Sequence, residues 1–309
     1  LAGKAVVFVT NTLYLFPEAE SAVVGTGSTD QGLGDFFSIV DTKFESKMRF
    51  SNSAGPEQLI AAKPDVVILK SYLKRSLGDP LEILGIPVLY VDLEAPDSFY
   101  SDVAMIGALL GNPERAGNII DYYKSKTTLV ENRTDSKNKP TVLVLSYSAR
   151  DGDTAFSVPP AHWLQTDVVE KAGGIPVWKD ENRGDGWKKV NLEQVAVWDP
   201  DYIFVISYRS PALAVIEDLN DRIGLGILRA ATEKHILPFP ADYYSWDQPD
   251  PRWILGLLWM ARTLHPESFP EMDIAEEVKY FYSELYGLED SVIEKEILSR
   301  LQGVLSSTP

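Results

Sequence analysis

Serine–tyrosine pairs follow two of the apolar stretches that the sequence predicts to be β-strands, at Ser71–Tyr72 and Ser207–Tyr208. Hydroxyl groups donate and accept hydrogen bonds and aromatic rings offer apolar faces, so these residues suit binding rather than bond-making. Ligands of parallel α/β sheets bind beyond the carboxyl ends of the strands. We therefore predict a ligand site formed by the residues near these ends, namely Asn11, Thr12, Thr26, Gly27, Ser28, Gln31, Ser71, Tyr72, Glu94, Tyr147, His162, Trp163, Tyr208, Arg209, Trp246 and Asp247.

Several of these side chains carry oxygen atoms that a hard ferric ion prefers. Tyr72, Tyr147 and Tyr208 would supply phenolates, and Asp247 or Glu94 would supply a carboxylate. The alternative is that these tyrosines are core or rim residues of the fold, because the chain has 14 tyrosines in all. The sequence leaves direct metal coordination open.

Tryptophans near the predicted site suggest an apolar wall instead. Trp163, Trp187 and Trp246 would line a chelate or macrocycle, with Arg209 pairing its negative charge. A small oxyanion is another possibility, because the backbone N–H groups of residues 25–28, Gly-Thr-Gly-Ser, could bind one. The alternative for that segment is an ordinary tight turn.

The chain has few histidines that could bind a metal or transfer a proton. His162 is one of three histidines and stands beside Trp163, on a loop expected to reach the ligand or to form a structural turn. No two histidines have metal-ligand spacing, so we expect no zinc or manganese cage. The nucleophile-elbow, P-loop, dinucleotide and zinc-protease motifs are all absent from the sequence, which predicts no enzyme and no cofactor. The alternatives are a tetrapyrrole metal chelatase, for which only His162 could handle protons and metal, and a sensory binding domain.

The amino-acid composition and net charge indicate a globular protein and argue against some kinds of binding partner. The 309 residues are 45% hydrophobic and 24% charged, as in globular proteins. A net charge of −16 argues against a nucleic-acid surface, where cationic side chains must neutralise phosphate. Cysteine is absent, which excludes disulfides and thiolate metal sites from these residues. The first residues lack a charged start followed by an apolar segment, so a signal peptide would have been removed or never existed.

Strands and helices are predicted to alternate twice along the chain. In the first half, the expected strands are residues 4–10, 21–27, 65–69 and 87–92, with helices at 55–63, 79–85 and 95–111. In the second half, short apolar segments from residue 141 to 240 alternate in the same way, followed by helices at 250–266, 273–287 and 290–303. Such alternation predicts parallel sheets with right-handed crossovers.

A capped helix separates the two halves. Asn112 can cap it, Pro113 fits its first turn, and apolar residues recur at helical spacing to about Asn132. We therefore predict an α/β fold of two Rossmann-like lobes joined by a single long helix, with the ligand cleft between the lobes. The expected domains are residues 1–112, a bridging helix and linker at 113–138, and residues 139–309.

The two halves also share a repeated pattern. Residues 55–72 and 191–208 both have Glu-Gln at the helix start, Pro-Asp before the strand and Ser-Tyr after it, 136 positions apart. So many matches at one offset are unlikely by chance and indicate two lobes of related design.

Six further segments follow one another in a fixed order between residues 5 and 287: PEQLIAAKPDVVI, GIPVLYVD, LLGNPERAG, EKAGG, NLEQVAVWDPDYIFV and SWDQPDPRWILGLLWMARTLHP. With these segments, the chain resembles the solute-binding proteins of ABC importers for iron-siderophore complexes, haem or cobalamin. The resemblance implies limited hinge motion and capture of an iron(III)-siderophore or similar metal chelate. Molybdate or tungstate, haem and cobalamin are the alternative ligands.

The same resemblance implies the partners and the location. Acidic residues on each lobe would dock onto an ABC permease, which works with its ATPase; the candidates are Asp79 or Glu82 and Glu217 or Asp218. The alternative is that these carboxylates are solvated surface groups. The resemblance further implies a monomer outside the cytoplasm, either periplasmic or anchored through a lipid on a cysteine that would precede Leu1.

Overall fold

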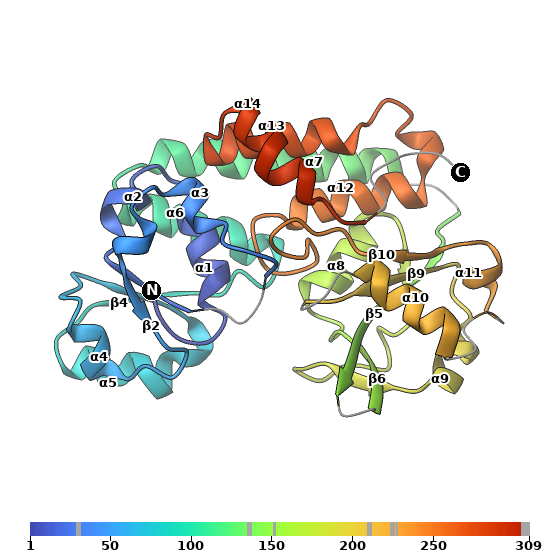
Figure 1. The fold of residues 1–309 in the computed structure, drawn as a ribbon, viewed down its shortest axis with the longest axis horizontal. Helices are drawn as coiled ribbons and strands as arrows, with labels where there is room; N and C mark the ends of the chain where they lie inside the picture. The colour runs from blue at the N-terminus through green and yellow to red at the C-terminus, as the bar shows by residue number, and fades with distance from the viewer. Residues whose placement is uncertain are drawn as a thin grey trace. The chain divides into compact units, whose positions relative to one another are not determined.

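The computed structural model describes residues 1–28, 32–134, 138–150, 153–208, 212–222, 226 and 228–303, with side chains undescribed at 148–150, 153–155 and 218–222. The chain forms two compact units (Figure 1). Unit 1 comprises Leu1–Tyr122, Pro249–Pro251 and Phe281–Glu289, and unit 2 comprises Tyr123–Gln248, Arg252–Tyr280 and Asp290–Pro309. The domain boundaries expected from the sequence stay a prediction.

Unit 1 is a set of short parallel strands covered by helices. Its strands are β1 (Gly25–Gly27), β2 (Met48–Phe50), β3 (Val67–Lys70) and β4 (Val88–Val91). Its helices are α1 (Val6–Leu13), α2 (Ala19–Ala22), α3 (Phe37–Val40), α4 (Pro56–Ile60), α5 (Asp79–Ile83) and α6 (Pro96–Leu109), with single turns at Phe44–Ser46, Ser71–Leu73 and Lys74–Gly78. Strand β1 pairs with β2 and β3 pairs with β4, both in parallel.

Two strand predictions in unit 1 are corrected by the structure. The predicted strand at residues 4–10 is wrong, because Val6–Leu13 form helix α1. All of its residues are buried, and the apolar run at residues 6–9 is too short to be assigned to a strand or a helix by periodicity alone. The predicted strand at residues 21–27 shortens to β1, after the helical turn α2.

Unit 2 is organised around one sheet. Its strands are β5 (Thr141–Arg150), β6 (Asp153–Val158), β7 (Ile175–Pro176), β8 (Lys188–Val190), β9 (Tyr202–Ile206) and β10 (Ile236–Pro238). The helices are α8 (Leu164–Lys171), α9 (Leu192–Trp198), α10 (Ala212–Arg222), α11 (Arg229–Thr232), α12 (Trp253–Leu264) and α14 (Asp290–Val292), with single turns at Pro266–Ser268, Ile293–Ile297 and Leu298–Arg300. The helix expected at 290–303 is therefore broken into short turns.

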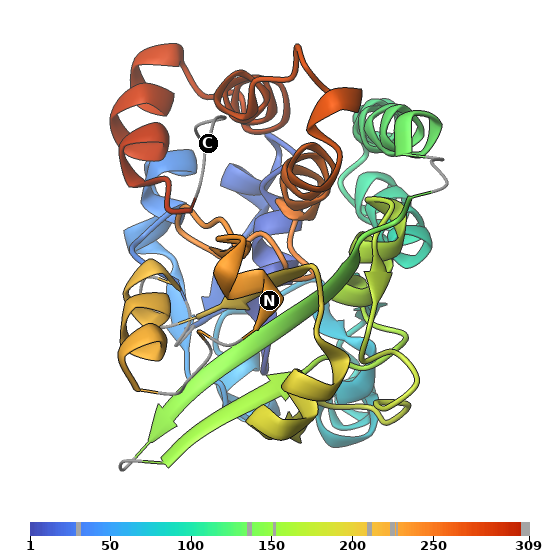
Figure 2. The same cartoon turned by 90° about the vertical axis from the view of Figure 1, so that its right-hand side faces the viewer.

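The sheet of unit 2 is mixed, whereas the sequence predicted a parallel one. The strand order is β10-β9-β5-β6-β8, with β7 beside β5. Strands β10, β9, β5 and β7 are parallel, but β6 and β8 pair antiparallel. Strands β5 and β6 form a long hairpin (Figure 2). The strand expected from residue 141 is confirmed as β5, whereas β6, with the sequence DTAFSV, lacks the apolar run on which the sequence analysis relied.

Two long helices have residues in both units. The predicted bridging helix is confirmed as α7 (Pro113–Thr134), which has residues in unit 1 up to Tyr122 and in unit 2 from Tyr123. Helix α13 (Ile274–Tyr286) likewise divides after Tyr280. The core of unit 2 is built on α12, whose Trp259 ring lies 5.0 Å from the Phe204 ring of β9. Of the helices that the structure describes, none combines the length and apolarity of a membrane span.

The repeated pattern found in the sequence corresponds to a repeated helix-strand pair. Helix α4 and strand β3 in unit 1 match α9 and β9 in unit 2. Each helix begins with a local cap: Gln58 Oε1 accepts the N–H of Gly55 at 3.1 Å, and Asn191 Oδ1 accepts the N–H of Gln194 at 2.9 Å. In both units the Ser-Tyr pair therefore follows a parallel strand.

Candidate functional site

In unit 1, the carboxyl ends of β3 and β4 bring together a group that we call the Lys70 patch: Lys70, Ser71, Tyr72 and Glu94. Lys70 ends β3, and its side chain is only 1% exposed. Its Nζ atom donates to the carbonyl oxygen of Asp92 and lies 2.5 Å from Glu94 Oε1. The Glu94 side chain is 43% exposed, so this ion pair joins a buried cation to a carboxylate at the surface.

The phenol of Tyr72 lies at the open side of the Lys70 patch. Tyr72 is 56% exposed, and its hydroxyl donates to the carbonyl oxygen of Lys4 at 2.8 Å. Desolvation of the hydroxyl, followed by the negative charge of Glu94, raises the pKa of Tyr72. This phenol therefore stays neutral and offers a polar edge and an apolar ring to a ligand.

Three predicted binding residues of unit 1 are committed to internal contacts. Asn11 and Thr12 do not follow a strand, because they lie within α1 and are fully buried. Asn11 Nδ2 donates to Asp250 Oδ2 at 2.5 Å, and Thr12 Oγ1 donates to the Phe8 carbonyl oxygen at 2.8 Å. Thr26 is also buried, with its Oγ1 atom 3.0 Å from that of Thr10. These three side chains hold α1 and β1 in place.

The glycine-containing segment at residues 25–28 is a strand end rather than an anion-binding loop. The backbone N–H of Gly27 donates to the carbonyl oxygen of Leu1 at 3.1 Å, and that of Ser28 donates to Phe50 at 2.7 Å. A side chain at Gly27 would place its Cβ atom 2.8 Å from Val6 Cγ1, so glycine allows α1 to approach β1. The donors of Gly27 and Ser28 are therefore already used within the fold.

In unit 2, a buried carboxylate organises the group that we call the Asp247 patch: Asp247, Tyr208, Gln165 and Ser245. Asp247 is 1% exposed. Its Oδ2 atom accepts hydrogen bonds from the Tyr208 hydroxyl at 2.7 Å and from Gln165 Nε2 at 3.2 Å. Its Oδ1 atom accepts from Ser245 Oγ at 2.5 Å. Residues from α8, from the end of β9 and from the loop after β10 thus converge on one carboxylate.

The Asp247 patch is shifted toward neutral forms. Burial raises the pKa of Asp247, although the hydrogen bonds from Ser245, Tyr208 and Gln165 oppose this effect. Burial and then the charge of Asp247 raise the pKa of Tyr208 well above its usual value. Because Tyr208 donates its proton to Asp247, its hydroxyl oxygen faces other groups as an acceptor.

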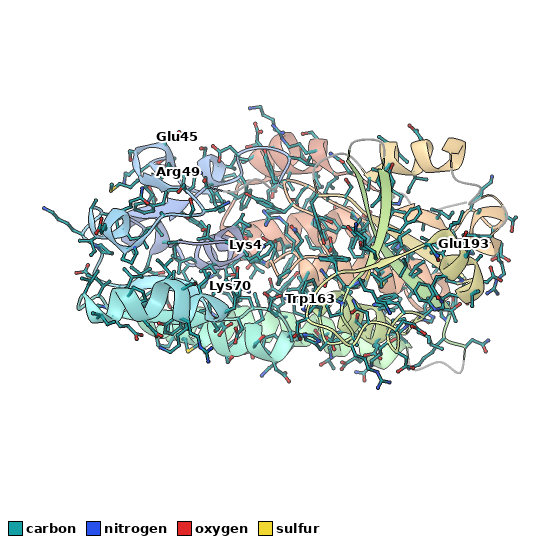
Figure 3. All side chains as sticks on the ribbon, turned by 90° about the horizontal axis from the view of Figure 1, so that it is seen from below. Lys4, Glu45, Arg49, Lys70, Trp163 and Glu193 are labelled. Atoms are coloured by element: carbon teal, nitrogen blue, oxygen red, sulfur yellow. The ribbon has the colours of Figure 1, made fainter. Side chains whose placement is uncertain are left out.

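Three partly buried rings adjoin the Asp247 patch, and we call them the aromatic trio: Trp163, Trp187 and Tyr208. The rings of Trp163 and Trp187 meet edge to face with centroids 5.8 Å apart, and those of Trp187 and Tyr208 with centroids 6.4 Å apart. Trp163 precedes the first turn of α8 and is labelled in Figure 3, which also labels Lys70 in unit 1.

Two other residues predicted for the ligand site, His162 and Tyr147, also belong to unit 2. The side chain of His162 is 57% exposed, with Nε2 4.0 Å from Asp185 Oδ1. Tyr147 on β5 is partly buried, with its ring 6.1 Å from that of Phe156.

The prediction that Trp246 contacts a ligand is not supported by its position. Trp246 is completely buried, and its indole N–H donates to Asp242 Oδ2 at 3.0 Å. Asp242 also pairs with Arg252, whose Nε atom lies 2.9 Å from Asp242 Oδ1, and both side chains are fully buried. Arg252 in turn lies over the ring of Tyr244, 5.1 Å from its centroid. The aromatic segment after β10 is therefore held mainly by buried contacts within unit 2, and Asp247 is the residue of this segment that belongs to the Asp247 patch.

The acidic residues expected to dock a permease differ in their surroundings. Asp79 and Glu82 both pair with Lys74, at 2.8 and 3.5 Å, and Glu82 Oε1 accepts from the Tyr90 hydroxyl at 2.9 Å. Glu217 is exposed on α10. The side chain of Asp218 and the residues Gln31 and Arg209 lie outside the described part of the structure.

Sequence reasoning missed Lys70, Gln165 and Ser245. The available signal for Lys70 was a lysine at the end of an otherwise apolar strand, directly before the Ser-Tyr pair. Gln165 carries no local signal, because it is 82 positions from Asp247 and meets it only after folding. Ser245 stands two positions before Asp247, so its closeness in the sequence to that predicted residue was the available signal. Within the described residues, no three His, Cys, Asp or Glu side chains converge in a metal-binding arrangement.

Comparison with known proteins identifies the family. The family model described as periplasmic binding protein matches residues 20–243, which is most of the chain. The chain belongs to the periplasmic binding protein family. The match includes β1 to β10, the whole Lys70 patch, and Gln165 and Tyr208 of the Asp247 patch, and it ends just before Ser245 and Asp247.

Individual relatives of this periplasmic binding protein are more distant. The molybdate-binding protein MolA of Haemophilus influenzae is 26% identical over 256 residues, covering 76% of this chain and 70% of the relative. The crystal structure of a periplasmic solute-binding protein from Veillonella parvula has a TM-score of 0.77 at 22% identity, covering 97% of this chain and 92% of that one. MolA bound to molybdate has a TM-score of 0.73 at 20% identity, covering 91% of both chains. The expected fold class, α/β with two lobes, is confirmed.

Proposed function

We propose that this periplasmic binding protein captures a metal chelate with apolar or aromatic groups, such as an iron(III)-siderophore, and delivers it to an ABC permease. The observation that carries the proposal is the aromatic trio of Trp163, Trp187 and Tyr208 beside the buried carboxylate of Asp247. Edge-to-face rings that are only partly buried supply apolar surface and ring faces for stacking. A ligand of some size, rather than a small ion, uses such a surface.

The polar groups of the same patch fit a ligand that donates hydrogen bonds. Tyr208 gives its proton to Asp247, so it offers an acceptor oxygen. Asp247 itself is an acceptor when ionised, and it repels an anion at short range. A small oxyanion needs converging donors, which this combination of phenol oxygen and carboxylate does not supply.

Tryptophan fluorescence tests this proposal directly. All seven tryptophans lie in unit 2, so their emission reports on the Asp247 patch rather than on the Lys70 patch. We expect saturable quenching by one ferric siderophore in a panel that also contains haemin, cobalamin, molybdate and tungstate. Trp163→Ala and Tyr208→Ala should each weaken binding by about tenfold or more, since an aromatic contact is worth about a kcal/mol beyond its buried area.

The matched control is Trp198→Phe, because Trp198 belongs to α9 and not to the trio. It should change emission without changing affinity. If Trp163→Ala and Tyr208→Ala bind as tightly as the unaltered protein, the aromatic trio is not the ligand site.

Molybdate or a related oxyanion is the second candidate. It is supported by the similarity to the molybdate-binding protein MolA and by the buried ammonium of Lys70 at the end of β3. An anion would compete with Glu94 for that ammonium. Calorimetry separates the two candidates, because oxyanion binding at the Lys70 patch should be abolished by Lys70→Met and unaffected by Trp163→Ala.

Delivery requires a partner in the membrane. We propose that Glu217 in unit 2 and Glu82 or Asp79 in unit 1 dock onto the permease, which works with its ATPase. The exposure of Glu217 and the partial exposure of Asp79 and Glu82 support this role. We further propose that the protein acts as a monomer outside the cytoplasm, either in the periplasm or anchored by a lipid.

A further inference from the structure

A cavity of about 390 Å³ lies within unit 1, at the amino ends of β1 and β3. Its lining includes Leu1, Gly25, Phe50, Leu59, Val67 and Ile68, and all of its lining residues except Ser21 and Asp65 are apolar. The cavity separates two parallel pairs of strands, β1-β2 and β3-β4, which the described residues leave as independent sheets. Two short parallel sheets that face a common apolar space are unusual, because parallel strands normally form one continuous buried sheet.

The edge of β1 that does not pair with β2 forms backbone hydrogen bonds with Leu1, in the pattern of a strand ladder. The amine of Leu1 donates to the carbonyl oxygen of Gly25 at 3.0 Å, and the N–H of Gly27 donates to the carbonyl oxygen of Leu1 at 3.1 Å. This pair of bonds is the pattern of two parallel strands, with Leu1 opposite Thr26. Residues bonded to Leu1 through its amine would therefore continue alongside Gly25 and Val24, which line the cavity.

The inner edge of β3 faces the same space. The N–H of Val67 donates to the Pro87 carbonyl oxygen at 2.9 Å, so Val67 and Leu69 point their backbone groups toward β4. Backbone groups alternate in direction along a strand, and those of Ile68 therefore point away from β4. Ile68 is buried and lines the cavity, so its peptide groups are placed for a second ladder.

We infer that this cavity is a slot for one β-strand: an extended apolar segment joined through its carboxyl end to the amine of Leu1. It would run parallel to β1 and β3 and merge the two sheets of unit 1 into one. About five residues would suffice, the usual length of a strand.

The walls of the slot fix the chemistry of the segment. Leu13 and Leu110 line the cavity from α1 and the end of α6, and Leu59 and Ala62 line it from α4 and the turn that follows. A strand covered by helices on both faces reads as a continuous run of valine and isoleucine rather than an alternating pattern. The buried amine agrees with such a peptide link, because burial lowers the pKa of the Leu1 amine to about 6. A neutral peptide bond at that point would avoid the cost of desolvating a charge.

The slot is tested with extended versions of the full chain. One carries about five valine and isoleucine residues ahead of Leu1, and a matched control carries glycine, serine and aspartate at equal length. We expect the apolar extension to raise the Tm by roughly 5 °C or more over the control, and amide exchange at Gly25 and Ile68 to slow on the order of a hundredfold. A third version with proline two residues before Leu1 should lose the gain, because that residue's N–H would face β1.

Several results would overturn the inference. Equal Tm values for the apolar and polar extensions would mean that no strand enters the slot. Unchanged exchange at Gly25 and Ile68, or a gain that survives proline, would exclude ladder formation. A gain that appears only together with dimers would assign the segment to another copy of the chain.

Discussion

The ion pair between Lys70 and Glu94 should stabilise unit 1, and we expect the loss of Glu94 to lower its stability more than the loss of Lys70. The Lys70 side chain is 1% exposed and the Glu94 side chain is 43% exposed, with 2.5 Å between Nζ and Oε1. Lys70→Met removes the buried charge and keeps an unbranched apolar side chain, while Glu94 turns to water. The loss is then about 1 kcal/mol, the net value of hydrogen bonds in water.

Glu94→Gln has the larger expected effect, because it leaves the ammonium buried without its counter-charge. Removing one partner of a fully buried pair costs about 3–5 kcal/mol, and the partial exposure of Glu94 reduces this to about 2 kcal/mol. The double variant Lys70→Met/Glu94→Gln should resemble Lys70→Met alone, since no charge is then left buried. The more exposed partner is thus the more damaging one to neutralise.

Native-state amide exchange at β3 and β4 is the suitable assay, because no tryptophan lies in unit 1 to report its unfolding. Lys74→Met is the matched control: Lys74 is 53% exposed and pairs with Asp79 at 2.8 Å, so its loss should leave the exchange rates of β3 and β4 close to those of the unaltered protein. The reasoning is refuted if Glu94→Gln costs no more than Lys70→Met, or if the double variant loses the sum of the two single effects.

Three further predictions concern unit 2 and docking. Burial raises the pKa of Asp247 above 3.8, so the Asp247 carboxyl keeps its proton to higher pH in the folded protein than in the unfolded chain. The free energy of unfolding should therefore fall as the pH rises from 3.8 through the folded-state pKa. Melting curves of Asp247→Asn should show a smaller fall over the same pH range. Arg252→Met should lower stability by about 3–5 kcal/mol in urea unfolding followed by tryptophan emission, since it leaves a buried carboxylate; an effect below 1 kcal/mol would contradict this. Glu82→Gln with Glu217→Gln should leave ligand affinity unchanged and impair uptake, whereas the exposed control Glu193→Gln should affect neither. Normal uptake in the double variant would remove the docking proposal.

Local signals explain which elements could be predicted. Helix α7 was expected from Asn112, Pro113 and its apolar spacing, and it is observed. The helix-strand pairs α4-β3 and α9-β9 were expected from their caps and prolines. Helix α1 was missed because its apolar run at residues 6–9 is too short to carry a period that distinguishes a helix from a strand, and the polar residues that follow are buried as well.

The sequence by itself determined the α/β alternation and the positions of the Ser-Tyr pairs, since these depend on neighbours within a few residues. It also indicated the family, through six segments in a fixed order along the chain. Only the tertiary structure decided which polar groups meet. Tyr208 and Gln165 are 39 and 82 positions from Asp247 in the sequence, and both donate hydrogen bonds to its carboxylate. The raised pKa of Tyr208 and of Asp247 therefore depends on contacts that no local pattern encodes. The burial of Trp246, the ion pair of Lys70 and the slot beside Leu1 likewise arise from packing between distant segments. Periodicity reports which side of an element is apolar, but it does not specify which element covers that side.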